Sequence, residues 1–237
     1  MYRPSNFSEL PEVVKNLLII NGLFFLATIS LDNFGLDLVK IFGLHQFQSP
    51  DFKPHQIITH LFMHGNFTHL FFNMFALWMF GKILENFWGA KRFLTFYIVT
   101  GIGAAFVHLL ISQYQILSIS NQIPEMLNLA IEGRYNPSVP ISKKLTQLII
   151  TPTVGASGAV FGLLLAFGML FPNTLLYLYF AIPVKAKYFV IAYGLLELYA
   201  GISNNPADNV AHFAHLGGMI FGFFLIKYWR KNTNSFY

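Results

Sequence analysis

Long apolar runs separated by short polar segments dominate this chain of 237 residues. A helix that crosses the hydrocarbon core of a bilayer needs about 20 mostly apolar residues. Six runs approach or exceed that length, at Val14–Leu31, Ile57–Leu84, Phe93–Ile111, Val154–Phe171, Tyr188–Ile202 and Val210–Trp229. The pattern therefore predicts an all-α membrane protein built as a bundle of six transmembrane helices.

Two of these runs are irregular. The second is longer than one span, so its His-rich first part is expected to be a surface or re-entrant piece, and the fifth is short and interrupted by Glu197. No internal repeat or low-complexity linker divides the chain. We expect a single membrane domain over residues 1–237. It includes a short cytoplasmic N-terminal segment of about residues 1–12 and a basic C-terminal tail of about residues 230–237.

Composition supports the membrane assignment. Hydrophobic residues make up 55% of the chain and charged residues 11%, with a mean hydropathy of +0.54, whereas soluble domains carry roughly 25% charged residues. The 27 Phe, 11 Tyr and 3 Trp are the reverse of a disordered composition. Because the chain has no Cys, a disulfide framework and a thiol nucleophile are excluded.

The basic residues predict an orientation. With the N-terminus in the cytoplasm, six alternating spans place ten basic residues inside: Arg3, Lys15, Lys82, Lys91, Arg92, Lys185, Lys187, Lys227, Arg230 and Lys231. The outer segments hold five: Lys40, Lys53, Arg134, Lys143 and Lys144. Since cytoplasmic loops are enriched in Lys and Arg, both termini are expected to be cytoplasmic. The net charge of +5 then reflects membrane topology, and no nucleic-acid partner is expected.

Polar residues gather at one depth of the predicted bundle. Three spans enter from the outer face, and within their first turns these carry polar or small residues: His69 and Asn73, then Gly155-Ala156-Ser157-Gly158, then Asp208 and Asn209 followed by His212 and His215. Polar groups inside a membrane are costly, and by default they mark a functional site.

Glycine spacing suggests how two of these spans meet. Gly158 and Gly162 form one GxxxG pair, and Gly218 and Gly222 form another on the helix face that carries His215. Such pairs let two backbones approach closely in lipid. We therefore expect Ser157 and His215 to form a nucleophile–base pair. His69 and Asn73 are then expected to stabilise an oxyanion, together with the Ser157 N–H.

With these motifs the sequence resembles the rhomboid family of intramembrane serine proteases, from about His55 to Gly222. The segment 155–158 matches the family's GxSG motif, residues 214–222 its AHxxGxxxG motif and residues 69–73 its HxxxN motif. Gly81, Glu85 and Gly89 resemble its GxxxE turn and the glycine after it.

The resemblance implies a serine endopeptidase that cleaves transmembrane segments of other membrane proteins and needs no cofactor or metal. Ser157 is the implied nucleophile and His215 the general base and acid. The family's dyad has no acidic third member, which agrees with the expectation that no Asp or Glu lies near His215 at matching depth. We expect a multi-pass protein of a bacterial inner membrane, with its active site open to the outer side. Its partners are the lipid bilayer and its substrates, and its oligomeric state is left open.

Two positions depart from the family pattern. The family's Trp-Arg pair ahead of the second helix is replaced by His55-Gln56, which leaves the anchoring of the first outer loop open. Four residues after Ser157, where some members have a Tyr stacked on the catalytic His, this chain has Phe161, which can pack on an imidazole but cannot donate a hydrogen bond. We expect Phe161, His212 and Gly155 to line the substrate-binding pocket.

Several simpler interpretations remain open. Ser157 could serve helix packing alone, and His212 could exchange roles with His215. His60, His64 and His69 could hold a metal ion, but no carboxylate stands at a suitable spacing, so we favour a polar cap over the site. Glu197 could relay protons, although a structural helix contact is favoured.

The alternative function is a catalytically inactive rhomboid-like protein that binds client helices, or a small transporter. An inactive relative would typically lack the Ser or the His, and both are present here. A transporter would favour an inverted repeat or several intramembrane charges, and the sequence offers no repeat and one such charge.

Overall fold

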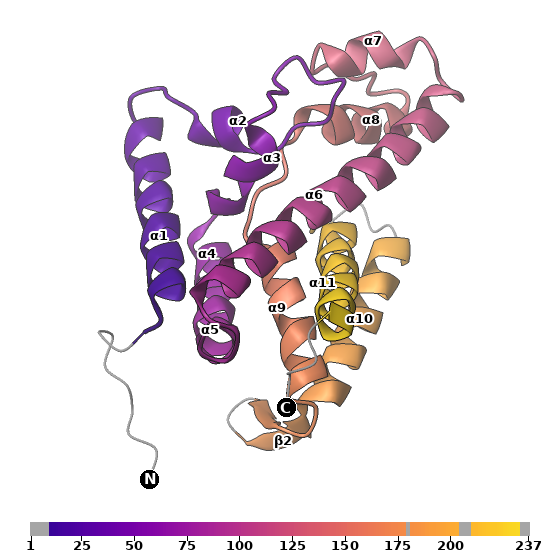
Figure 1. The fold of residues 1–237 in the computed structure, drawn as a ribbon. Helices are drawn as coiled ribbons and strands as arrows, with labels where there is room; N and C mark the ends of the chain where they lie inside the picture. The colour runs from indigo at the N-terminus through magenta and orange to yellow at the C-terminus, as the bar shows by residue number, and fades with distance from the viewer. Residues whose placement is uncertain (1–9, 179–180, 204–209, 233–237) are drawn as a thin grey trace.

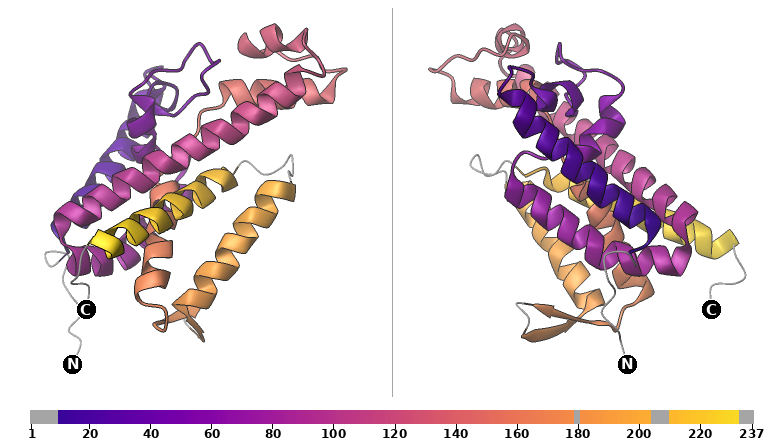
Figure 2. Two further views of the ribbon diagram at one scale, coloured as in Figure 1. Left: turned by 45° about the vertical axis from the view of Figure 1, so that its right-hand side comes forward. Right: turned by 90° about the vertical axis from the view of Figure 1, so that its left-hand side faces the viewer.

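The six predicted runs correspond to helices in the computed structural model, which describes residues 10–178, 181–203 and 210–232. The main helices are α1 (Glu12–Asp32), α4 (Phe67–Ala76), α6 (Ala90–Ser120), α9 (Ser157–Leu170), α10 (Ala186–Ser203) and α11 (His212–Asn232). α6 crosses the molecule diagonally, and α11 lies between α6 and α10 (Figures 1 and 2). α9 packs against both α6 and α11, so the helices that carry Ser157 and His215 are direct neighbours. Asp208 and Asn209 lie outside the described residues.

The second run divides as the sequence suggested. Its His-rich first part forms the short helices α3 (Gln56–Thr59) and η2 (His60–Phe62), and a continuous helix then follows through α4, η3 (Leu77–Gly81) and α5 (Lys82–Trp88). The side chain of Asn66 accepts a hydrogen bond from the His69 backbone N–H at 2.8 Å, a typical N-cap. This cap fixes the start of α4 and places His69 in its first turn.

The long outer segment after the third run is helical rather than irregular. α6 continues to Ser120, and two short helices, α7 (Met126–Ile131) and α8 (Pro140–Ile150), pack beyond its end (Figure 1). Their small apolar core contains Ile116, Ala130, Leu145 and Ile149. The polar and apolar mixture of this segment reflects two amphipathic helices closing on the end of α6.

The all-α prediction is wrong at one place. After α9, an antiparallel hairpin pairs β1 (Leu175–Leu178) with β2 (Ile182–Lys185), in a register that sets Leu176 opposite Val184. These strands join α9 to α10 at the end of the molecule away from α7 and α8 (Figure 1). Segments of four residues are too short to produce a clear alternation of polar and apolar positions in the sequence.

Within the described residues, three helices are long and apolar enough to cross a membrane: Glu12–Asp32, Phe67–Trp88 and Ala90–Ser120. α9 is apolar but has 14 residues. Large apolar side chains on α10 are exposed, among them Leu195, Leu196 and Ile202, as expected of a surface that contacts lipid. These findings support an integral membrane protein, while the six-span count and the cytoplasmic termini stay predictions.

Glu85 joins α1 to the rest of the bundle. Its two carboxylate oxygens accept hydrogen bonds from the backbone N–H groups of Val13 and Val14, at 2.9 and 2.8 Å. The first N–H groups of a helix have no partner within the helix, and they favour an anion. The buried carboxylate therefore caps α1 from α5. The following Gly89, at φ 78°, permits the turn into α6.

Close backbone packing joins α9 to α6 and α11. A Cβ added to Gly218 would overlap the carbonyl oxygen of Gly158, and one added to Gly162 would lie 2.7 Å from the Thr100 Cβ. One added to Gly222 would lie 3.0 Å from the Phe96 ring. The GxxxG pairs thus lie at the helix contacts, as their spacing predicted.

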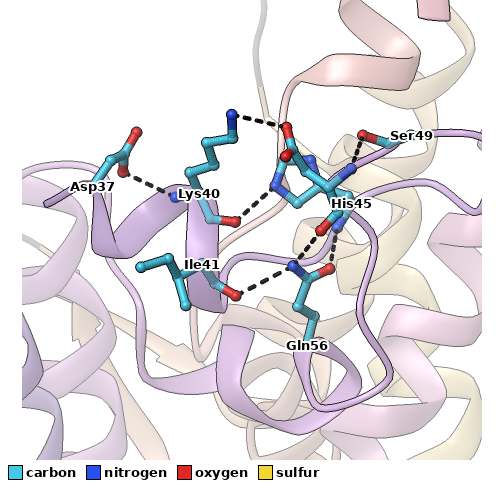
Figure 3. Close-up of polar contacts among 7 residues, drawn as sticks. Asp37, Lys40, Ile41, His45, Ser49 and Gln56 are labelled. Carbon is cyan, nitrogen blue, oxygen red and sulfur yellow. Dashed lines mark hydrogen bonds and ion pairs between the residues drawn. The ribbon is translucent and has the colours of Figure 1, made fainter.

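The first outer loop is anchored by Gln56, which is fully buried. Its Oε1 accepts from the backbone N–H of His45, and its Nε2 donates to the carbonyl of Ile41 (Figure 3). Oε1 also accepts from the Lys53 N–H and Nε2 donates to the Asp51 carbonyl, and the four distances are 2.9 to 3.3 Å. The ring of His55 adds a contact to the Ile41 carbonyl at 3.0 Å. The residues that replace the family's Trp-Arg pair therefore hold this loop through its backbone.

We expect Gly218→Ala to destabilise the protein by at least about 1–3 kcal/mol, because a new methyl group forces α9 and α11 apart. The matched control is Gly22→Ala on α1, where an added Cβ meets nothing within 4 Å and Ala favours the helix by about 1 kcal/mol. Thermal unfolding in detergent micelles measures both. Equal stability of the two variants would contradict the packing described.

We expect Gln56→Leu to destabilise the protein by about 3 kcal/mol or more, since each buried backbone group left without a partner costs roughly 1–3 kcal/mol. Gln48→Leu removes a single side-chain hydrogen bond, to Gln113, and should cost about 1 kcal/mol. Limited proteolysis of the loop at residues 43–55, together with thermal unfolding, compares the two. A Gln56→Leu variant as resistant as its control would mean that Gln56 does not anchor the loop.

Candidate active site

Ser157 and His215 lie within hydrogen-bonding distance of each other. Ser157 is the first residue of α9, and His215 lies in the first turn of α11. The distance between Ser157 Oγ and His215 Nε2 is 2.8 Å, although 58 positions separate the residues. His215 is 8% exposed. The structure thus brings together the two residues that the sequence predicted as nucleophile and base.

A carboxylate stands behind the imidazole. Oε2 of Glu197, on α10, lies 2.8 Å from His215 Nδ1, so the expectation that no acidic residue lies near His215 is wrong. The prediction failed because Glu197 lies on a different helix, and spacing within one helix does not show which neighbour a side chain faces. The sequence did contain a signal, since a single ionisable residue in an otherwise apolar helix usually faces a partner inside the bundle.

His212 contacts the same carboxylate oxygen, with its Nδ1 at 2.7 Å from Glu197 Oε2. The rings of His212 and His215 are 6.3 Å apart and nearly perpendicular. Of the two histidines on this oxygen, His215 is the one that contacts the Ser157 hydroxyl.

The ring of Phe161 stacks on the imidazole ring of His215. The two ring centroids are 4.1 Å apart, and the planes are inclined by 6°. Tyr193 of α10 packs on Phe161 in turn, at 5.1 Å between ring centroids. The stack fixes the plane of the imidazole, so Phe161 supplies the packing that its position suggested.

Gly155 and His69 border Ser157. A Cβ built on Gly155 would lie 2.7 Å from His69 Nε2 and 3.7 Å from Ser157 Oγ, and Gly155 has φ 126°. Both the space and the backbone conformation therefore require glycine. Its N–H donates to the His60 carbonyl at 2.9 Å, which ties the segment before Ser157 to the helix before α4. The His69 ring thus reaches the site.

Asn73 lies one turn after His69 on α4 and is buried. Its Nδ2 donates to the His69 backbone carbonyl at 2.9 Å. An amide NH₂ group carries two hydrogens, so this contact uses one of them. Asn73 therefore lies beside His69. Its role in stabilising an oxyanion stays a prediction.

Two further buried histidines, His60 and His64, precede α4. Burial lowers the pKa of His60 to about 4, because desolvation disfavours the imidazolium. Burial also lowers the pKa of His64 to about 4, and its ring lies 5.1 Å from that of His69. Both imidazoles are therefore neutral at neutral pH. The described part of the chain offers no hydrogen-bond partner to either ring nitrogen of His64.

One group in the described residues has the spacing of metal ligands, and it differs from the cluster weighed in the sequence. Its members are Glu197, His212 and His215, whose ligand atoms lie within 4.8 Å of one another. Hydrogen bonds already use Glu197 Oε2 and the Nδ1 atoms of both histidines. A metal ion would have to displace these contacts, so the group is better described as hydrogen-bonded.

A family model for the rhomboid domain matches residues 51–232. The chain belongs to the rhomboid family. Its relatives include Rhomboid protein 1, mitochondrial, of Saccharomyces cerevisiae, which is 31% identical over 70% of this chain and 39% of the yeast protein. RHOMBOID-like protein 12, mitochondrial, of Arabidopsis thaliana is 29% identical over 87% of this chain and 55% of the plant protein. Rhomboid protease AarA of Providencia stuartii is 31% identical over 68% of this chain and 51% of that protein.

This rhomboid chain spans about half the length of the curated relatives it matches. Two of the three carry mitochondrial names, which does not fit the expected bacterial plasma membrane. The relatives therefore support an integral membrane protein of the rhomboid family and assign it no particular membrane.

We expect Gly155→Ala to slow the reaction of Ser157 with a fluorophosphonate by about 10- to 100-fold. The new methyl group strains the backbone at residue 155 by about 1–3 kcal/mol and also displaces the His69 ring. Each 1.4 kcal/mol, roughly, corresponds to a tenfold change in rate. Gly65→Ala is the control, because its Cβ meets nothing within 4 Å. The labelling rate of detergent-solubilised protein measures the effect. Equal rates in both variants would show that the close contact between Gly155 and His69 does not shape the site.

Proposed function

We propose that this rhomboid protein is an intramembrane serine endopeptidase that cleaves transmembrane segments of other membrane proteins. The observation that carries the proposal is the 2.8 Å contact between Ser157 Oγ and His215 Nε2. That contact is what a general base needs in order to take the proton of an attacking hydroxyl. The proteases named among the relatives, AarA and GluP, support the same reaction class.

The reaction follows acyl transfer in two steps. Ser157 Oγ attacks the carbonyl carbon of the scissile peptide bond while His215 Nε2 takes the hydroxyl proton. The tetrahedral intermediate collapses as the C–N bond breaks, and His215 returns the proton to the leaving amine. A water molecule then attacks the acyl-enzyme, again with His215 as base, and releases the carboxylic acid and free Ser157.

The developing oxyanion needs donors beside Ser157. The backbone N–H of Ser157 lies at the start of α9, where helix N–H groups have no partner within the helix. His69 Nε2 borders the same glycine as Ser157 Oγ, and Asn73 lies one turn along α4. We assign His69 and Asn73 to this role, in which one donor typically contributes about 10²- to 10³-fold.

The proposal also includes the arrangement in the membrane. One domain over residues 1–237 crosses the bilayer six times, with both termini in the cytoplasm and the site open to the other side. The short segment of about residues 1–12 and the tail of about residues 230–237 flank it. The sequence-based orientation rests on the excess of basic residues in the inner segments. Lipid and transmembrane substrates are the proposed partners, and the bacterial plasma membrane stays a prediction that the mitochondrial relatives do not support.

Ser157→Ala should abolish both fluorophosphonate labelling and cleavage of a model transmembrane substrate, since no other group supplies the nucleophile. Ser138→Ala is the matched control on the exposed outer segment and should behave as wild type. In-gel fluorescence and cleavage by purified protein in liposomes measure the two activities.

Two outcomes would contradict the proposal. Labelling of Ser157→Ala at the wild-type level would remove Ser157 as the nucleophile. Wild-type protein that binds the model substrate but neither cleaves it nor reacts with the probe would favour the inactive client-binding alternative.

A further inference from the structure

Glu197 is buried on α10, a helix on which most of the large apolar side chains are exposed. Within α10, the buried side chains are those of Ala186, Val190 and Glu197, while Leu196 and Leu198 on either side of Glu197 are 61% and 41% exposed. Burying a carboxylate costs free energy unless it is paired and hydrogen-bonded. A helix contact alone would be made at lower cost by an apolar side chain, so the pairing of Glu197 requires a chemical explanation.

The contacts of Glu197 determine which nitrogen of His215 carries the proton. An ionised carboxylate only accepts hydrogen bonds, so the Nδ1 atoms of His212 and His215 donate to Oε2 over 2.7 and 2.8 Å. A neutral imidazole protonated at Nδ1 has its lone pair at Nε2. In His215 that atom is the one 2.8 Å from Ser157 Oγ, where a general base must accept a proton.

We propose that Glu197 is a positioning residue for His215, so that the site works as a Ser157–His215–Glu197 array rather than as a dyad. The inference rests on the proposed function. Glu197 holds the imidazole in the tautomer that accepts the Ser157 proton, and its charge stabilises the imidazolium that forms during attack. Phe161 fixes the ring plane, and Glu197 fixes the rotation of the ring within that plane.

The packing of α10 on α11 brings the carboxylate within reach. Added Cβ atoms at Gly194 and Gly201, three residues before and four residues after Glu197, would lie 3.2 Å from Met219 Cε and from the Phe213 ring. These glycines let the two helices approach on both sides of Glu197. His212 contacts the same carboxylate oxygen through its Nδ1, at 2.7 Å, and so helps to hold Oε2 beside His215.

The tautomer of His215 is the direct test and does not depend on activity. In Ser157→Ala protein labelled with ¹⁵N-histidine, NMR should show His215 protonated at Nδ1 and unprotonated at Nε2. The additional change Glu197→Gln should shift His215 toward the other tautomer or a mixture. Protonation of His215 at Nε2 in the presence of Glu197 would overturn the proposal.

Kinetics give the second arm. Glu197→Gln, which keeps the shape and removes the charge, should lower kcat by at least about 10-fold and by at most roughly the 10⁴-fold seen when a triad Asp becomes Asn. Glu197→Leu should lower kcat further, and KM should stay within about twofold, since lost transition-state stabilisation appears in kcat. Glu132→Gln, an exposed carboxylate paired with Arg134 on the outer segment, should match wild type.

The outcomes separate this proposal from the proposed function. If Ser157→Ala is inactive but Glu197→Gln retains kcat within about twofold, the positioning role is wrong and the enzyme works as a dyad. If the loss in Glu197→Gln appears in KM or in thermal stability with kcat unchanged, Glu197 is structural and the positioning role is wrong. An inactive wild-type protein would remove the proposed function and this role together.

Discussion

The contact between the backbones of α9 and α11 at Gly158 and Gly218 is the constraint on which the site depends. Any side chain larger than hydrogen at Gly218 would occupy the position of the Gly158 carbonyl oxygen. Ser157 is adjacent to Gly158, and His215 lies three residues, about one turn, before Gly218, so the same contact sets the distance between the nucleophile and the base. Lipid provides no hydrophobic drive to join helices, and close van der Waals packing is what remains. The small residues thus set the geometry of the proposed active site and stabilise the bundle by one interaction.

Three buried polar side chains are each paired with the backbone or with other side chains, because a buried polar group without a partner costs free energy. Glu85 caps α1, Gln56 holds the first outer loop, and Glu197 accepts from two imidazoles. Each is buried and each has at least two partners. Charged residues make up only 11% of this chain, and these three buried side chains lie where they hold a helix end, a loop or the His215 ring. The low share of charged residues indicates a membrane protein, and the charged side chains that are buried, Glu85 and Glu197, each have specific partners.

The sequence was sufficient to predict that Ser157 and His215 lie close together. Ser157, His215 and the GxxxG pairs could be predicted because their spacing within one helix encodes a face, and the structure brings Ser157 and His215 together with those glycines at the contact. Glu197 could not be placed in the same way. Its relation to His215 depends on the rotation of α10 against α11, which no spacing within a single helix determines. The β1–β2 hairpin was missed because strands of four residues are too short to define a period. Helices α7 and α8 were missed because helices this short form only by packing on a neighbouring element, here the end of α6.

The close approach of Ser157 and His215 is tested most directly by an experimental structure of the fluorophosphonate adduct in lipid. The predicted result is phosphorus bonded to Ser157 Oγ, His215 Nε2 within about 3 Å of that oxygen, and α9 and α11 in contact at Gly158 and Gly218. An adduct on another residue, or a His215 ring turned away from Ser157 with the two helices apart, would contradict it.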